Sequence, residues 1–292
     1  LFRSAVHPNA GPFAGHAQLG QFLNLSIGAM LALALVQIGQ AFSGEDPTGR
    51  EVIDRLGSVP MRFAVLLGLL ALAAAAALAW SNTRAGMLSL LIAGFVTFVL
   101  LFFKRGWRGR ETKIAVTLFL FVIVVLSAGF VVLKPLIHKP NASVEVSGQT
   151  RMAILKTMSP MFTTWPVMGT GLESFEWVYP MFDQDTASNS FYDHAENDYA
   201  QTLSDTGIIG AVLTLAFLLI IFRNWLKAFV DRRPIQLAAV GIAFAMVAVL
   251  AHSTSDFSQR TPAVALLSCV LVGLTVCLAN LAEAEPASES AK

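Results

Sequence analysis

Residues 63–80 read FAVLLGLLALAAAAALAW, a run that contains no charged side chain. About 20 apolar residues in a row are enough for a helix to cross the hydrocarbon core of a bilayer. The run shows no strand-like alternation, so it predicts a transmembrane helix. The alanines at 73–77 would let another helix pack closely against this one, because small residues allow backbones to approach in lipid.

Similar apolar blocks recur along the chain. Hydrophobic residues make up 55% of its 292 residues and charged residues 13%, whereas a soluble domain averages roughly 25% charged residues. The blocks long enough to span a membrane are 19–42, 61–80, 86–103, 114–133, 207–222, 235–251 and 263–279. The sequence therefore predicts an all-α, polytopic transmembrane bundle of about seven spans. The net charge is +1 and the basic residues are scattered, so nothing predicts a nucleic-acid partner.

The orientation of the bundle follows from two basic loops. Residues 104–113 read KRGWRGRETK, and a second basic stretch follows the fifth block at 223–233. The positive-inside rule predicts that both loops lie in the cytoplasm. The segments then expected on the opposite, outer side are 1–18, 81–84, 134–206 and 252–262.

This topology divides the chain into four parts. The predicted parts are 1–133 with transmembrane helices one to four, 134–206 as one large outer loop with an amphipathic helix, 207–280 with transmembrane helices five to seven, and 281–292 as a disordered cytoplasmic tail. All five histidines fall in or beside the outer segments. Because titrating side chains gather on one face, we expect a functional site there.

The sharpest local pattern is HAENDYAQTLSDTGIIG at 194–210, which runs directly into the fifth apolar block. The imidazole of His194 can accept a proton from a hydroxyl near neutral pH, which makes it a candidate general base. The alternative is a solvated histidine at the outer end of a helix. The residues alone leave both interpretations open.

Arg84 is a candidate ligand of a phosphate group, since the planar guanidinium matches phosphate oxygens. Arg84 lies at the outer end of the second block, where snorkelling to lipid headgroups is the alternative. Arg151 opens a segment, 150–162, that predicts an amphipathic helix on the outer interface. The apolar stripe expected on this helix consists of Met152, Leu155, Met158 and Phe162.

Three shorter patterns lie in the predicted outer segments. The turn HSTSDFSQRTP at 252–262 combines His252, Asp256 and Arg260, which indicates either a functional group or a structural Asp256–Arg260 ion pair. The glycines of Gly-Thr-Gly at 169–171 predict a sharp turn. The Asp-x-Asp at 183–185 has no further ligand spacing, so a solvated loop is a better interpretation than a metal site.

Together these motifs resemble the bacterial O-antigen ligase and O-antigen polymerase superfamily. The strongest similarity is in HAENDYAQTLSDTGIIGAVL, where Asn197 and Asp198 follow the histidine, and in HSTSDFSQRTPA. Weaker similarities are NTRAG at 82–86, the Arg151 helix leading into the Gly-x-Gly turn, and AGPFAGHAQLGQFLNL near the beginning. Two departures are Glu196, where many members have a second histidine or another residue, and Thr-Arg instead of Ser-Arg at 83–84.

The resemblance implies a GT-C-like membrane glycosyltransferase in the bacterial inner membrane, with its active face and its large loop in the periplasm. The donor would be a glycan on undecaprenyl diphosphate. The acceptor would be a hydroxyl of lipid A-core, of another lipid-linked repeat or of a protein. Members usually have more spans toward the amino terminus, and this chain begins at Leu1 rather than Met, so we expect earlier spans in the full gene product.

The resemblance also implies roles for individual residues. His194 would be the catalytic base, Arg84 and Arg151 would bind the donor diphosphate, and inversion at the sugar carbon would follow. The residues with supporting roles would be Asn197, Asp198, His252, Asp256 and Arg260. No cofactor and no metal are expected, because the arginines can neutralise the diphosphate.

Two other classes of function compete with this interpretation. A transporter or flippase of an anionic or lipid-linked substrate would place its polar groups near the bilayer midplane, often on broken helices. A structural membrane subunit would not need the clustered His and Arg residues. Ligase, polymerase and protein glycosylation are not distinguished by the sequence, and neither are the sugar and the oligomeric state.

Overall fold

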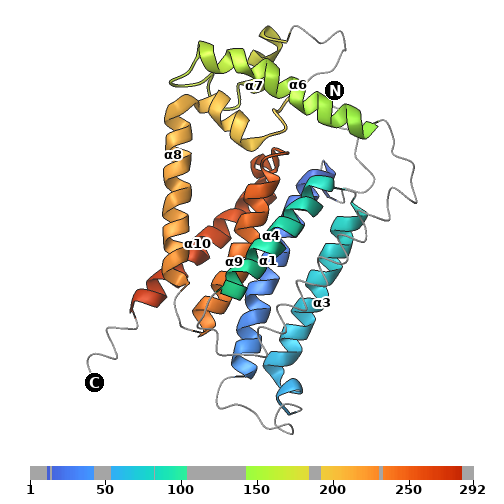
Figure 1. Cartoon of the computed structure of the whole chain (residues 1–292), viewed down its shortest axis with the longest axis vertical. Helices are drawn as coiled ribbons and strands as arrows, with labels where there is room; N and C mark the ends of the chain where they lie inside the picture. Colours follow the sequence, from blue (N-terminus) through green and yellow to red (C-terminus); the bar gives the residue numbers. More distant parts are fainter. Residues whose placement is uncertain are drawn as a thin grey trace. The chain divides into compact units, whose positions relative to one another are not determined.

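The fold is described here from a computed structural model, in which residues 12–13, 15–42, 54–81, 83–103, 143–183, 192–229 and 233–284 are placed. Every regular element within these ranges is a helix, which confirms the prediction of an all-α chain. The chain divides into two units, and each is considered by itself. One is a bundle of apolar helices, and the other contains residues of the predicted outer loop together with the segment Ser253–Thr261 (Figure 1).

Among the described residues, five helices are long and apolar enough to cross a membrane, so the chain is a multi-pass membrane protein. They are α1 (His16–Ala41), α3 (Val59–Trp80), α8 (Asp198–Ala228), α9 (Arg233–His252) and α10 (Pro262–Ala284). In α9 the candidate span begins at Pro234. All five overlap predicted spans. A sixth predicted span corresponds to α4 (Arg84–Phe103), whose apolar part, Arg84–Leu100, is shorter. The predicted span at 114–133 lies outside the described residues.

In the helix bundle, α1 packs against both α3 and α9, and α4 packs against α9 (Figure 1). Glycines set the distance between α1 and α9. A Cβ atom added to Gly241 would lie 2.2 Å from the backbone nitrogen of Ala32, and one added to Gly28 would lie 2.5 Å from the Cβ of Ala245. Close backbone contact is how helices associate in lipid, where there is little hydrophobic drive between them.

Polar side chains hold the beginning of α4 against α1. The buried amide Nδ2 of Asn24 donates to the carbonyl of Gly86 at 3.0 Å, and Oγ1 of Thr83 donates to the carbonyl of His16 at 2.7 Å. Such hydrogen bonds fix helix register where no water competes for the polar groups. Arg84 follows directly as the first residue of α4, with an exposed side chain.

The second unit has a small core of its own. Helix α6 (Ser143–Thr164) packs Ile154, Met158 and Met161 against α7 (Phe175–Val178) and the short turn η1 (Tyr179–Met181). Phe175 and Tyr179 supply the buried aromatic rings of this core, and Ala195 closes it from the segment before α8.

A helix, α6, is present where the amphipathic helix was predicted, but only part of the predicted apolar stripe is buried in this core. Met158 is fully buried, Leu155 and Phe162 lie at the edge of the core, and Met152 is 67% exposed. The buried stripe is Ile154, Met158 and Met161, spaced i, i+4 and i+7. The segment carries apolar residues on more than one side, so the periodicity alone does not determine which side faces the core.

We predict that Gly241→Ala destabilises the bundle by about 1–3 kcal/mol, because its methyl group would overpack the contact with Ala32. Thermal unfolding of the detergent-solubilised protein measures the effect. Gly273→Ala is the matched control, since nothing lies within 4 Å of the added atom, and alanine favours a helix over glycine. Equal stability of the two variants would contradict the packing described for α1 and α9.

Candidate functional site

Helix α8 is broken at Gly207, whose backbone has φ 61° and ψ −161°. This left-handed region is readily adopted only by glycine. The break frees two carbonyl groups on the preceding turn. The carbonyl of Ser204 accepts from the N–H of Thr170, and the carbonyl of Asp205 accepts from the N–H of Gly171, both at 2.9 Å. A loop from another part of the chain thus takes over hydrogen bonds that the helix gives up.

The same loop also satisfies the other side of the break. The N–H of Ile208 donates to the carbonyl of Pro166 at 2.9 Å, and the N–H of Ile209 donates to the carbonyl of Val167 at 3.3 Å. Backbone groups that lose helical partners must find others when they are not solvated. We call residues 166–171 the docking loop. Its backbone supplies the hydrogen-bond partners that the turns of α8 on both sides of Gly207 have lost.

Two glycines make this docking possible. A Cβ on Gly169 would lie 2.5 Å from the carbonyl carbon of Asp205, and a Cβ on Gly207 would lie 2.4 Å from the carbonyl oxygen of Val167. Both glycines have positive φ, 69° and 61°. The sharp turn expected at Gly-Thr-Gly is present, and what approaches Gly169 closely is the backbone of α8 itself.

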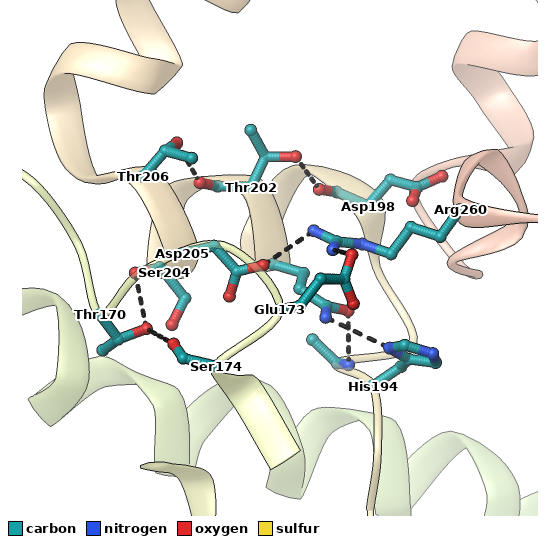
Figure 2. Close-up of polar contacts among 12 residues, drawn as sticks. Thr170, Glu173, Ser174, His194, Asp198, Thr202, Ser204, Asp205, Thr206 and Arg260 are labelled. Carbon is teal, nitrogen blue, oxygen red and sulfur yellow. Dashed lines mark hydrogen bonds and ion pairs between the residues drawn. The ribbon is translucent and has the colours of Figure 1, made fainter. Parts of the chain in front are cut away.

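Glu173, two residues after the docking loop, and Asp205 of α8 each bring a carboxylate to Arg260 (Figure 2). Nη2 of Arg260 lies 3.0 Å from Oδ2 of Asp205, and Nη1 lies 2.6 Å from Oε1 of Glu173. The side chain of Asp205 is fully buried, that of Arg260 is 18% exposed, and that of Glu173 is 68% exposed. The guanidinium is therefore held from inside by one carboxylate and covered from outside by another.

An Asp256–Arg260 ion pair was one of the two interpretations of this turn, but the ion pairs of Arg260 are with Asp205 and Glu173. Asp256 is buried and accepts a hydrogen bond from the hydroxyl of Ser258, while Arg260 pairs with Asp205 and Glu173. Residues 258–260 form a 3-10 turn, η2 (Ser258–Arg260). The turn places Ser258 rather than Arg260 next to the Asp256 carboxylate.

His194 lies half-buried in the same unit, in the segment before α8 (Figure 2). Its ring centroid is 4.1 Å from that of Phe257, and its Nδ1 is 3.3 Å from Nε2 of Gln201. Burial is the main cause that lowers the pKa of His194, and the positive charge of Arg260 lowers it further, against the nearby carboxylate of Asp193. The imidazole is therefore neutral at neutral pH.

Arg151 pairs with Glu196 across 3.2 Å, and the two side chains are 36% and 32% exposed. Glu196 has φ 54° and Glu173 has φ 59°, and within the described residues these are the non-glycine positions with positive φ. A left-handed residue other than glycine costs about 1–2 kcal/mol. Both strained residues are thus carboxylates that face an arginine of the site.

The beginning of α8 is tied to the segment that follows α9. Asn197 accepts from the N–H of Ala200 through Oδ1, which caps the helix, and donates from Nδ2 to the carbonyl of Thr254 at 2.8 Å. The N–H of Asp198 donates to the carbonyls of Ser253 and Asp256 at 3.0 and 3.1 Å. Asn197, Asp198 and Asp256 therefore fix the relative position of His194, Phe257 and Arg260.

The structure thus brings together, in one unit, these predicted site residues: Arg151, His194, Asn197, Asp198, Asp256 and Arg260. Arg84 and His252 belong to the helix bundle. Arg84 is exposed at the beginning of α4, and His252 is fully buried at the last position of α9. Their roles stay predictions.

Sequence reasoning missed Gln201, Asp205 and Glu173. Gln201 and Asp205 are buried, and with Asp198 they lie at i, i+3 and i+7 on the first turns of α8. A polar stripe at helical spacing is a signal that could have identified them. No comparable local signal marks Glu173, which meets Arg260 across 87 residues of sequence.

The apolar helices define a multi-pass membrane protein, and the second unit gives it a cluster of histidine, arginines and carboxylates. A family model described as O-Antigen ligase, Wzy_C, matches residues 69–215, which include Arg84, Arg151 and His194. The chain belongs to this family of membrane enzymes of the O-antigen ligase and polymerase type, which act in surface polysaccharide synthesis. Searches among curated proteins and among solved structures returned no match.

We predict that Asp205→Asn destabilises the protein by roughly 3 kcal/mol, because it removes the fully buried carboxylate that faces Arg260. Glu173→Gln should change stability by less than about 1 kcal/mol, because this carboxylate is mostly exposed. Chemical denaturation of the two purified variants provides the comparison. The opposite ranking would mean that Glu173 holds Arg260 more firmly than Asp205 does.

A second prediction concerns pH. Burial, with the nearby carboxylates of Glu196 and Asp198, raises the pKa of Asp256 to about 7, while Arg151 opposes the shift. Because the folded state binds this proton more tightly than the unfolded state, stability falls as pH rises from about 4 through 7. Asp256→Asn mimics the protonated form, so the fall in melting temperature between pH 5 and 8 should be smaller in this variant. An unchanged pH slope would contradict the assignment.

Proposed function

We propose that the protein is a GT-C-like glycosyltransferase of the bacterial inner membrane. It transfers a glycan from undecaprenyl diphosphate to a hydroxyl acceptor at the periplasmic face. The observation that carries the proposal is the cluster in which neutral His194 lies near Arg260, Glu173 and Glu196, the last of which pairs with Arg151. Membership of the O-antigen ligase family supports the same substrate class.

The reaction needs positive charge at the leaving group. A new bond forms between the acceptor oxygen and the anomeric carbon while the bond from this carbon to the diphosphate breaks, and its electron pair leaves with the diphosphate. Arg151 is suited to bind this group, because its partly exposed partner Glu196 can be exchanged for phosphate oxygens. Arg84, exposed at the beginning of α4, is the second proposed ligand.

The hydroxyl proton of the acceptor must pass to a base, which is the role predicted for His194. A neutral imidazole can either take a proton or donate a hydrogen bond. With arginines as the counter-charge, the proposal requires no metal and no cofactor. The acceptor is lipid A-core for a ligase and another lipid-linked repeat for a polymerase.

Transport is the alternative, and the break in α8 bears on it. Broken helices of transporters use their freed backbone groups to bind substrate. At Gly207 those groups already bond to the docking loop, so the break holds a fold together instead of offering a binding site. This observation favours the enzyme over a transporter or flippase.

The test is the surface glycan profile of the native host, with the full-length gene carrying His194→Ala or Arg151→Ala at matched protein level. Loss of the polymer with single repeats on lipid A-core would indicate a polymerase, and long lipid-linked polymer left unattached would indicate a ligase. Arg151→Lys should restore little activity, because lysine lacks the planar fork.

Lys156→Ala is the control, because Lys156 is exposed on α6, the helix that carries Arg151. This variant should leave the glycan profile unchanged. Unchanged profiles for both His194→Ala and Arg151→Ala would overturn the proposed function.

A further inference from the structure

The docking loop carries apolar side chains on the surface of the second unit. Val167 is 54% exposed and Met168 is 74% exposed, and Trp165, which directly precedes the loop, is 39% exposed. Residues 157–172, which include the loop, contain no charged side chain. A single exposed apolar residue is ordinary on a protein surface, so the position of this group in the fold decides what it means.

The position of the loop is set by its hydrogen bonds to α8. The N–H groups of Ile208 and Ile209, the first residues after the break, donate to carbonyls of the loop. From Ile208 to Phe222 the helix has no charged residue, and most of its large apolar side chains are exposed, as the lipid-facing residues of a span are. The exposed side chains of the docking loop therefore lie beside the lipid-facing surface at the beginning of this span.

The uncharged part of α8 is short for a membrane span. Residues 208–222 are roughly 22 Å long at about 1.5 Å per residue, whereas the hydrocarbon core is about 30 Å thick. A short span is accommodated by local thinning of the bilayer and by flanking residues that lie in its interface. At the Gly207 end the exposed flanking residues are those of the docking loop, which puts the loop at the depth of the interface.

Several polar groups in and beside the loop are satisfied without water, as lipid requires. The N–H groups of residues 169–171 donate to backbone carbonyls. Just before the loop, the exposed Thr163 and Thr164 donate their hydroxyls to the carbonyl of Pro160 at 2.9 and 2.8 Å. A surface that binds another protein would instead present such groups outward for hydrogen bonds.

We propose that the docking loop is a membrane-interface anchor. Val167 and Met168 lie in the lipid where the α8 span begins, and Trp165 lies at the level of the headgroups. Tryptophan is enriched at this level because its ring is apolar while its N–H can bond to water or headgroups. The buried stripe of α6 packs in the core of the second unit, so the loop, and not this stripe, meets the bilayer.

This anchor sets the depth of the charged site. Asp205, the buried partner of Arg260, lies three residues before Ile208, which is at most about 11 Å along the chain. Arg260 is thus held close to the depth of the lipid phosphate groups. The inference does not depend on the proposed function, but such an anchor would let a lipid-linked diphosphate reach the site without leaving the membrane.

Spin labels on cysteines measure what surrounds the loop. The full chain is reconstituted in liposomes of phosphatidylcholine and phosphatidylglycerol, with Cys269→Ala and Cys277→Ala to remove the native thiols. Labels are attached to Met168→Cys in the loop, to Leu213→Cys on the exposed surface of α8, and to Lys156→Cys at an exposed position of α6. Collision rates with oxygen, which concentrates in lipid, are compared with those of a water-soluble nickel chelate.

We expect the oxygen-to-nickel ratio at Met168→Cys to be several-fold higher than at Lys156→Cys and to approach that at Leu213→Cys. A ratio equal to that at Lys156→Cys would overturn the inference, because the loop would then lie in water. Low collision rates with both reagents would overturn it as well, since the label would be covered by protein. Dipolar broadening between labels would identify that protein as a second copy of the chain.

A second measurement uses charge. Met168→Asp should lower the melting temperature in lipid nanodiscs by several degrees, because a carboxylate is poorly accommodated among acyl chains. Met168→Leu is the matched control and should leave the melting temperature unchanged. Since Met168 is mostly exposed, neither change disturbs packing within the protein. Equal melting temperatures of the two variants would contradict the anchor.

Discussion

The exchange of backbone hydrogen bonds at Gly207 is the constraint on which the site depends. Without the docking loop, the break in α8 would leave carbonyl and N–H groups unsatisfied beside a membrane span, where each such group costs several kcal/mol. The docking of residues 166–171 also brings Glu173 to Arg260, because Glu173 lies two residues beyond Gly171. One backbone interaction thus joins α8 and α7 and sets the position of an arginine from a third segment.

Arg151 and Arg260, the two arginines of the second unit, are held in different ways. Arg260 is mostly buried and bridges Asp205 and Glu173, and a buried pair of this kind is expensive to break. Arg151 is more exposed, and its contact with Glu196 is of the kind that contributes little to stability. This difference suits a structural role for Arg260. Under the proposed function, Arg151 is the cation that exchanges Glu196 for an anionic substrate group.

The sequence was most informative where one physical effect dominates. Long apolar runs identified the helices α1, α3, α8, α9 and α10, because no other structure satisfies the backbone of such runs in lipid. The orientation of α6 was only partly predicted, since apolar residues on several sides compete for the core. The partners of Arg260 could not be predicted, because Asp205 lies 55 residues away and the pairing requires the docking loop.

The two glycines of the docking contact have a consequence for how chains of this kind can be recombined. Gly169 and Gly207 are each closed off by backbone atoms, so no smaller neighbour can make room for a side chain at either position. A chimera that exchanges the docking loop, residues 166–171, between two relatives would therefore have to carry the first turns of α8 with it. The modular unit in this protein is the docking loop plus the broken helix, although Gly169 and Gly207 lie in separate segments of the sequence.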